Sequence, residues 1–412
     1  ARLCDFRAGD GRAIDRGLAL YFPAPHSYTG EDVLELHAHG SPVVMKMLLR
    51  RCLELGARLA RPGEFSERAY RNGRLDLAQA EAVADLIASG TEAAARSAMH
   101  SLQGEFSARI HDLVAELTEL RVVVEAAIDF PDEGIDQVTD DDARLTQRLR
   151  ALQHRFAQVR DSARQGRLLR DGLKVVLTGP PNAGKSSLLN ALSRQPRAIV
   201  SEIPGTTRDL LEQWIEIDGL PVEIVDTAGL RDGADEIEIE GVRRALEAQR
   251  QADLILLVVD DADADACCVE ALRQRAAAIA PVCVVRNKID LSGRAAGVFG
   301  DGNDGSDDND NVAASALRGD GVGDLIALIK RRAGFRDSDD DRFIARQRHV
   351  DALRRAGAHL DAAFAQLAQS AAAAELLAEE LSACQRALGE ITGEVGSDDL
   401  LGLIFASFCI GK

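Results

Sequence analysis

The sequence lacks the features that place a protein in a membrane or outside the cell. No apolar run approaches the roughly 20 residues that a transmembrane helix needs, and no signal peptide precedes Ala1. The seven cysteines show neither paired disulfide spacing nor metal-ligand spacing. These absences predict a soluble protein of the reducing cytoplasm that has no membrane partner.

Positive charge is also scarce. The chain has 49 Lys and Arg against 67 Asp and Glu, a formal net charge of −18. Because nucleic acids are bound through Lys and Arg that release counterions, this balance excludes broad, sequence-independent wrapping of nucleic acid. A nucleic acid would have to meet a local basic patch. Two candidates are residues 342–348 and the arginines between 50 and 61, although arginines paired with acids on helix faces are the simpler interpretation.

The length of 412 residues predicts two to three domains. Residues 1–72 mix short apolar runs with turn signals and predict a small α+β domain. From Asp76, which can cap a helix together with Gln79, apolar residues recur at helical spacing to about residue 168. An α/β pattern occupies 169–335, and helical periodicity resumes over 336–412. The periodicity alone allows one helical domain interrupted by an insertion or two separate helical units.

A phosphate-binding loop opens the α/β region. Its residues Gly179–Ser186 follow an apolar strand run, Lys174–Thr178, and precede a helical run. In such a loop the backbone N–H groups turn toward phosphate oxygens, Lys185 adds charge at the β and γ positions, and the hydroxyl of Ser186 holds Mg²⁺. The strand–loop–helix context makes a chance match improbable, and the loop predicts a nucleoside triphosphate site.

Three further motifs follow in the order that a guanine-nucleotide switch requires: Gly205–Asp209, Asp226–Gly229 and Asn287–Asp290. Asp226 closes a second apolar strand, where it can reach the metal through water. Thr207 can complete the magnesium shell only when GTP is bound, as a switch element does. The carboxylate of Asp290 can accept both the ring N–H and the exocyclic amine of guanine, which adenine cannot offer. The set therefore predicts a GTPase rather than an ATPase.

The spacing of the motifs predicts their places in the sheet. Lys185 and Asp226 are 41 residues apart, enough for one β-α-β step, and Asp226 and Asn287 are 61 apart, enough for two. The segment 315–317 is expected to supply the last base contact. The Gly-, Asp- and Asn-rich stretch 297–311 has little to bury and is predicted to be a disordered loop.

The water-orienting glutamine of Ras-type enzymes is missing, because Leu230 follows Gly229. Another group must then position the attacking water. The carboxylates of residues 231–238 are candidates, while an acidic, solvated switch loop is the plainer interpretation of that composition.

Four segments outside these motifs carry a family resemblance: Ser27–Glu35, Arg61–Glu67, Leu75–Glu81 and Phe408–Lys412. Together with the nucleotide motifs, the chain resembles the MnmE/TrmE family of tRNA-modifying GTPases over nearly its whole length. The resemblance implies an N-terminal folate-binding and dimerisation domain (1–72) and an all-α domain (73–168 and 336–412) split by an inserted Ras-like P-loop GTPase domain (169–335). It also implies that the start of the folate domain lies before Ala1.

The resemblance supplies the full set of GTP-site residues. Within it, Lys185 and Asp226 serve catalysis and Ser186 and Thr207 hold Mg²⁺. The implied GTP-binding residues are Asn182, Ala183, Gly184, Lys185, Ser186, Ser187, Ser201, Glu202, Ile203, Pro204, Gly205, Thr206, Thr207, Asp226, Thr227, Ala228, Gly229, Asn287, Lys288, Asp290, Ser315, Ala316 and Leu317.

Potassium and a glutamate replace the usual catalytic groups in this family. The resemblance places K⁺ on the side chain of Asn182 and on the backbone carbonyls of Ser201, Ile203 and Thr206. It assigns the water-activating role to Glu238. Pairing of G domains in a homodimer is expected to order the switch that carries Glu238.

A folate site is implied at Glu35, Arg74 and Lys412, for 5,10-methylenetetrahydrofolate or its 5-formyl analogue. A carboxylate suits the donor edge of the pterin, and an arginine suits the glutamate tail of folate. Family members have lysine where this chain has Arg74, a change that keeps the charge and alters geometry. Cys409 is either a chemically active thiol or a structural tail residue, and the two readings are equally open.

The implied function is potassium-dependent GTP hydrolysis coupled to aminomethyl or carboxymethylaminomethyl modification of the wobble uridine (U34) of tRNA. A heterotetramer with the FAD-dependent protein MnmG is the implied assembly. The alternative is a regulatory GTP switch without folate chemistry, such as a ribosome-assembly GTPase. Such a switch would have no use for Glu35, Arg74 or the tail from Cys409 to Lys412.

Overall fold

The fold was analysed in a computed structural model. The structure describes residues 1–129, 138–194, 198–200, 212–226, 246–263, 265–299, 311–336, 342–367, 374–394 and 404. The chain divides into two compact units. The first contains residues 1–87, 99–158 and 351–412, and the second contains residues 88–98 and 159–350. Each unit is therefore built from segments far apart in the sequence.

The N-terminal part of the first unit has the predicted α+β composition. Strands β1 (Arg2–Arg7), β2 (Ala13–Phe22) and β3 (Val33–His37) form an antiparallel sheet in the order β1-β2-β3. Helices α1 (Pro42–Glu54) and α2 (Glu64–Arg71) follow. The register places Leu20 of β2 opposite Glu35 of β3.

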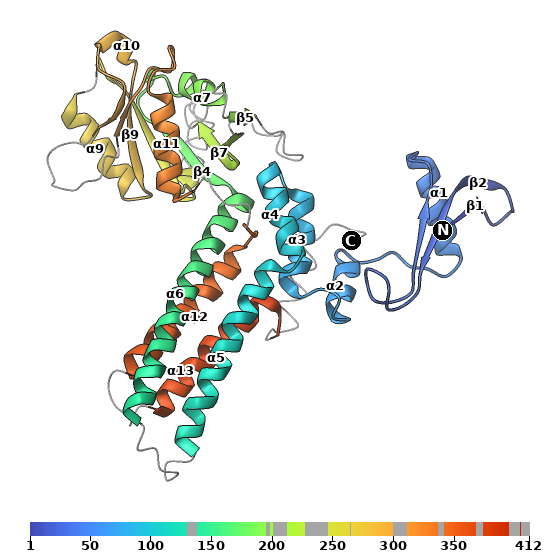
Figure 1. Ribbon diagram of the computed structural model, residues 1–412. Helices are drawn as coiled ribbons and strands as arrows, with labels where there is room; N and C mark the ends of the chain where they lie inside the picture. Colours follow the sequence, from blue (N-terminus) through green and yellow to red (C-terminus); the bar gives the residue numbers. More distant parts are fainter. Residues whose placement is uncertain are drawn as a thin grey trace. The chain divides into compact units, whose positions relative to one another are not determined.

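Helices from both halves of the sequence form one bundle, which belongs to the first unit except for residues 159–171 of α6 and 347–350 of α12. Its members are drawn side by side in Figure 1: α5 (Glu105–Asp129), α6 (Val138–Asp171), α12 (Gln347–Leu367) and α13 (Ala374–Thr392). Gln153 of α6 donates to Asp361 of α12 at 2.9 Å, and Arg121 of α5 donates to Gln385 of α13 at 2.7 Å. The sequence left open whether the two helical regions are one domain, and these contacts join them.

Two shorter helices, α3 (Leu77–Ala88) and α4 (Glu92–Leu102), precede the bundle helices. The predicted cap of α3 is present, because Gln79 N–H donates to Asp76 Oδ1 at 2.8 Å and Asp76 N–H donates to Gln79 Oε1 at 3.0 Å. This reciprocal pair satisfies two of the N–H groups that a helix start leaves open. None of the helices in the described ranges combines the length and the apolar character needed to cross a bilayer.

The second unit is built on an eight-stranded sheet with the order β10-β11-β9-β8-β4-β7-β6-β5. The pairs β4–β7, β4–β8, β8–β9 and β9–β11 are parallel, and the remaining three pairs are antiparallel. Its strands are β4 (Leu173–Thr178), β5 (Ala198–Val200), β6 (Glu212–Ile217), β7 (Leu220–Asp226), β8 (Leu254–Asp260), β9 (Val282–Asn287), β10 (Gly297–Phe299) and β11 (Asn311–Ala313).

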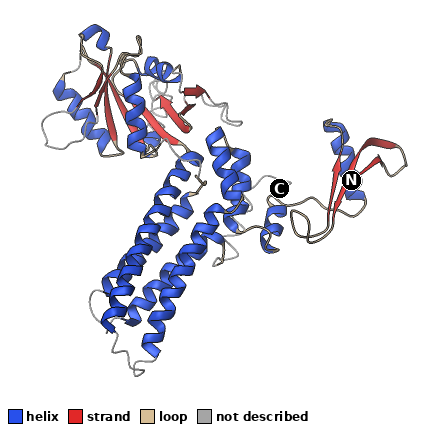
Figure 2. Ribbon diagram, viewed as in Figure 1, coloured by secondary structure: helices blue, strands red, loops and turns tan. Residues whose placement is uncertain are grey.

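Helices cover both faces of this sheet (Figures 1 and 2). Side chains of β8 alternate between two cores. One core includes α7 (Lys185–Ser193) and α11 (Val322–Ala333), while the other includes Val269 of α9 (Ala266–Ala277). A strand buried on both faces reads as a continuous apolar run, which explains the sequence of β8. The short helix α10 (Ile289–Ser292) follows β9.

Two sequence predictions about the strands need correction. The interval from Lys185 to Asp226 is not one simple β-α-β step, since β5 and β6 add an antiparallel extension to the sheet. The stretch 297–311 is not loop throughout, because β10 pairs with β11 at its two ends, while 300–310 lie outside the described residues. The ring of Phe299 at the end of β10 lies 5.5 Å from the Arg294 guanidinium carbon, a cation–π contact.

Gly166 permits a close approach of α6 to the segment before α12. A Cβ added at Gly166 would lie 2.1 Å from the carbonyl oxygen of Phe343, which is backbone and cannot move cheaply. We therefore expect Gly166→Ala to lower the free energy of unfolding by about 1–3 kcal/mol, as overpacking does. Gly323 of α11 is the matched control, because its added Cβ would meet nothing within 4 Å. Gly323→Ala should stabilise slightly in urea unfolding, and an equal loss in both variants would contradict the close approach.

Candidate nucleotide site

The loop between β4 and α7 has a backbone that requires its glycines. Gly179 has φ +139°, and an added Cβ there would lie 2.0 Å from the carbonyl oxygen of Val258. Gly184 has φ +91°, and its Cβ would lie 2.3 Å from Asn287 Nδ2. Both positions are left-handed and crowded, so only glycine fits. Asn182, at φ +61°, is of the residue type that tolerates this region best after glycine.

Lys185 begins α7 and turns its amine back over the loop. Its Nζ donates to the carbonyl oxygens of Gly179 at 3.1 Å and Pro180 at 2.7 Å. The residue is only 6 % exposed. The positive charge therefore lies at the N-terminus of α7, where backbone N–H groups and the helix dipole also favour an anion.

Ser186 and Asp226 meet beside this loop. The hydroxyl of Ser186 donates to Asp226 Oδ2 at 2.9 Å, and Asp226 is 7 % exposed. The pairing follows from the sheet, because Asp226 ends β7 opposite Leu177 of the neighbouring parallel strand β4. A hydroxyl and a carboxylate oxygen are hard ligands of the kind that Mg²⁺ prefers, so the donor pair fits that ion.

Asn287 connects three segments of the site. Its Nδ2 donates to the carbonyl oxygen of Ala183 in the phosphate loop at 2.9 Å. Its Oδ1 accepts from the N–H of Ala316 at 3.0 Å. The residue ends β9 and is 1 % exposed. One buried amide therefore fixes the loop after β4 against the loop after β11.

Asp290 is held ready to accept hydrogen bonds as an anion. The hydroxyl of Ser315 donates to Asp290 Oδ1 at 2.6 Å, and this bond, with smaller effects of Arg318 and Lys288, holds the pKa of Asp290 below its usual value. Lys288 itself is paired with Asp260 at 2.7 Å. The carboxylate therefore stays ionised throughout the neutral range.

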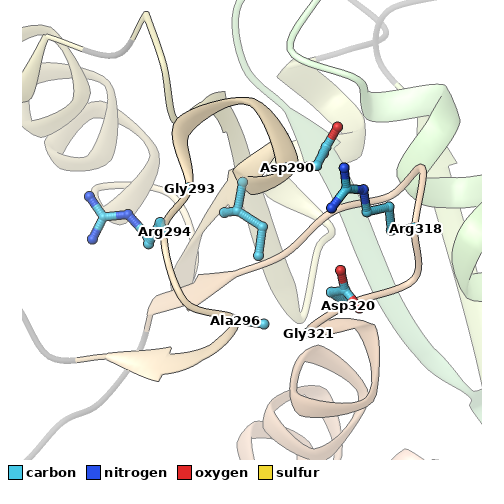
Figure 3. Close-up of a pocket in the computed structure, with 8 residues that line it drawn as sticks. Asp290, Gly293, Arg294, Ala296, Arg318, Asp320 and Gly321 are labelled. Atoms are coloured by element: carbon cyan, nitrogen blue, oxygen red, sulfur yellow. The ribbon is translucent and has the colours of Figure 1, made fainter.

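An open cavity of about 450 Å³ lies beside Asp290. Figure 3 shows Asp290, Arg318 and Asp320 among the residues that surround it. The cavity is lined by Ile289, Asp290, Gly293, Arg294, Ala296, Arg318, Asp320 and Gly321. It is large enough for a planar heterocycle and offers both acceptors and donors to it.

Comparisons with known proteins decide the family. Residues 77–409 match the model of the MnmE helical domain, and residues 1–74 match that of the GTP-binding protein TrmE N-terminus. The tRNA modification GTPase MnmE of Methylococcus capsulatus is 56% identical over 407 residues, covering 99% of this chain and 88% of that protein. The MnmE of Yersinia pestis is 52% identical over 412 residues, covering 99% and 89%. The chain belongs to the MnmE family.

The solved structures that resemble the chain add nothing to this conclusion. The G domain of the T. maritima FeoB iron transporter is 24% identical and covers 39% of this chain and 98% of that one, with a TM-score of 0.28. A score this low supports no argument. The predicted family, the fold class of an MnmE protein and its class as a GTPase are confirmed by the family models and relatives.

The structure brings together the MnmE motif residues that it describes. The phosphate loop, Asp226, Asn287, Asp290 and Ser315 converge at the carboxyl ends of β4, β7, β9 and β11. Leu317 is 86 % exposed. Sequence reasoning missed Arg318 and Asp260, although Asp260 closes an apolar strand as Asp226 does. The predicted site residues that lie outside the described ranges are Ser201, Glu202, Ile203, Pro204, Gly205, Thr206, Thr207, Thr227, Ala228, Gly229, Glu238, Cys409 and Lys412.

The folate residues predicted from the MnmE resemblance are described only in part. Glu35 on β3 is bonded to His37 Nε2 at 3.0 Å, and Arg74 is exposed beside Gly30. Within the described ranges no hydrogen bond or ion pair joins Glu35 to Arg74. The same ranges contain no group of three His, Cys, Asp or Glu side chains that could hold a metal ion.

Replacing Asn287 should loosen both loops that it connects. Asn287→Ala leaves the carbonyl of Ala183 and the N–H of Ala316 without this partner, and we expect a loss of about 2–3 kcal/mol in the free energy of unfolding. The amide hydrogen of Ala316 should also lose protection in hydrogen exchange. Asn190→Ala, at an exposed position of α7, is the control and should change neither quantity. Unchanged protection at Ala316 would contradict the connecting role.

Proposed function

We propose that this chain hydrolyses GTP and couples the hydrolysis to modification of the wobble uridine of tRNA. The observation that carries the proposal is the convergence of a phosphate loop, a hydroxyl–carboxylate pair and an anionic Asp290 around Asn287. The tRNA part is supported by the relatives, which are tRNA modification GTPases over 99% of this chain.

The phosphates would lie over the loop from Gly179 to Ser186. Lys185 would exchange its bonds to the loop carbonyls for the β- and γ-phosphate oxygens. Ser186, together with Thr207, would hold Mg²⁺, and Asp226 would reach the ion through water. When bound, Mg²⁺ neutralises charge on the β- and γ-phosphates. The buried carboxylate of Asp226 keeps the hydroxyl of Ser186 oriented toward this place.

The base would lie in the cavity beside Asp290. The ionised carboxylate accepts from the ring N–H and the exocyclic amine of guanine, and Ser315 keeps it in position. Adenine presents no such pair of donors at that edge, so the site selects GTP. Lys288, Ala316 and Leu317 complete the base contacts in this proposal.

Water attack on the γ-phosphate would need other groups in place of the Ras-type glutamine, because Leu230 stands after Gly229. We assign the orientation of the water to Glu238 and a potassium site to the side chain of Asn182, with the carbonyls of Ser201, Ile203 and Thr206. Asn182 is exposed in its left-handed conformation, so its amide oxygen is available to a cation. When bound, K⁺ would supply positive charge where negative charge develops on the phosphates.

The modification chemistry would require further components. We propose a homodimer that works with the flavoprotein MnmG, with 5,10-methylenetetrahydrofolate at Glu35, Arg74 and Lys412. The exposed carboxylate of Glu35 and guanidinium of Arg74 fit a ligand with donors at one end and carboxylates at the other. Exposed apolar side chains of the N-terminal part support self-association: Leu34 is 62 %, Val43 66 % and Leu55 69 % exposed.

GTP turnover measured in K⁺ and in Na⁺ tests the hydrolytic mechanism. We expect turnover to be roughly 10-fold or more faster in K⁺, and Asn182→Ala to remove the difference. Asn182→Asp, which keeps a side-chain oxygen, is the control.

Glu238→Gln should lower turnover by about 10²–10⁴-fold and leave GTP affinity unchanged, because it removes only the group that orients the water. Equal rates in both salts would exclude the ion site, and an unchanged Glu238→Gln rate would return the role to another carboxylate.

Titration with 5-formyltetrahydrofolate tests the one-carbon chemistry. The wild-type chain should bind it, and Glu35→Gln and Arg74→Ala should each weaken binding by roughly 10-fold, the effect of one charge-assisted hydrogen bond. Arg71→Ala is a matched control on α2, because Arg71 is paired with Glu67 at 2.8 Å. A wild-type chain that hydrolyses GTP and binds no folate would favour a switch without folate chemistry.

A further inference from the structure

Helix α6 has a charge opposite to that of the whole chain. Between residues 143 and 171 it carries eight arginines and two aspartates, a formal charge of +6, whereas the chain carries −18. The described side chains of this segment include no exposed large apolar residue. The segment is therefore a basic, polar surface within an acidic protein.

Four of these eight arginines are already engaged. Arg148 is paired with Glu119 at 2.7 Å and Arg155 with Glu116, both on α5. Arg170 is paired with Asp171, and Arg150 lies 5.7 Å from the centre of the Phe364 ring. Arg144 closely follows residues 129–142, whose side chains the structure does not describe. The four engaged arginines are therefore less available to a large partner.

Three of the remaining arginines form a row. Within the part of the chain that the structure describes, no hydrogen bond or ion pair engages Arg160, Arg164 or Arg167. The first two are exposed and the third is half-buried. Their spacing of four and three residues puts them on one face of the helix. At a rise of about 1.5 Å per residue the row spans roughly 10 Å.

We propose that the row Arg160–Arg164–Arg167 binds the sugar–phosphate backbone of tRNA. The proposal rests on the proposed function, which makes tRNA the substrate. Guanidinium groups match phosphate oxygens in bidentate geometry, and a row on one helix face can follow consecutive phosphates. A protein partner is a poorer fit, because the cores of protein interfaces are rich in aromatic and aliphatic anchors and this face has none exposed.

The basic cluster of the N-terminal part lacks this property. On the N-terminal part, Arg58 and Arg68 are both bonded to the buried carboxylate of Glu64, and Arg61 is paired with Glu67 at 3.0 Å. The bonds that Glu64 accepts, that from Arg58 foremost, lower its pKa, so this carboxylate stays ionised beside Arg58 and Arg68. The α6 row is a stronger candidate than the arginines between 50 and 61.

Binding of an unmodified tRNA transcript with uridine at position 34, measured over a series of KCl concentrations, tests the proposal on the full chain. The triple variant Arg160→Gln, Arg164→Gln, Arg167→Gln should bind on the order of 10- to 100-fold more weakly. The slope of log affinity against log salt should fall by about 2–3, since each phosphate contact contributes about 0.7–0.9. The Arg→Lys triple should keep most of the slope because it keeps the charge.

A matched control removes the same charge from the same helix. The triple Arg148→Gln, Arg155→Gln, Arg170→Gln changes arginines that are ion-paired, and its salt slope should stay near that of the wild type. Both Gln triples should unfold cooperatively on heating and hydrolyse GTP at the wild-type rate, which excludes a folding defect.

The outcomes separate the inference from the function on which it rests. Wild-type binding and slope in the Arg160/Arg164/Arg167 triple would overturn the α6 surface and leave the proposed function standing. Equal losses in both triples would reduce the effect to net charge and also overturn it. A triple that loses only MnmG binding would make the row a protein contact. A wild-type chain that binds no tRNA, alone or with MnmG, would overturn the tRNA function itself.

Discussion

The nucleotide site depends on the buried amide of Asn287. Its two hydrogen bonds, to the carbonyl of Ala183 and from the N–H of Ala316, connect the loops that follow β4 and β11. These loops come from strands that are not adjacent, since β8 and β9 lie between them and β4 pairs with β8. A buried amide with both ends satisfied fixes such a geometry strongly, because either loop can move only by leaving a polar group unpaired.

The sheet explains why a single side chain can connect so much. Four parallel strands, β4, β7, β9 and β11, bring their carboxyl ends to one edge, and each ends in or beside a polar residue of the site. The strands themselves are almost entirely apolar and are buried by helices on both faces. Polar groups that would be costly in the core are therefore confined to the edge, where a ligand can meet them.

The sequence predicted those elements whose signal is local. Strand β4, helix α7 and the Asp76–Gln79 cap follow from short apolar runs and capping chemistry, and each is present. Strands β5 and β10 were missed because each is only three residues long, and β6 was missed although Ile215, Glu216 and Ile217 alternate as an antiparallel strand does. Contacts such as Ser315–Asp290 and Lys288–Asp260 join residues 25 and 28 apart, and only the folded sheet brings them together.

The net charge of the sequence was a poor guide to where a nucleic acid could bind. A net charge of −18 argues correctly against wrapping of nucleic acid, since long-range attraction to a polyanion is absent. It says nothing about a single helix face, because contacts with phosphates act within about 10 Å at ordinary salt. The arginines of α6 fall into two groups in the folded structure. Some form ion pairs, as with Glu116 and Glu119 of α5, and others form none among the described residues. An acidic protein with one such row repels polyanions over most of its surface and admits them along one face, so the net charge that disfavours wrapping also directs where a tRNA can bind.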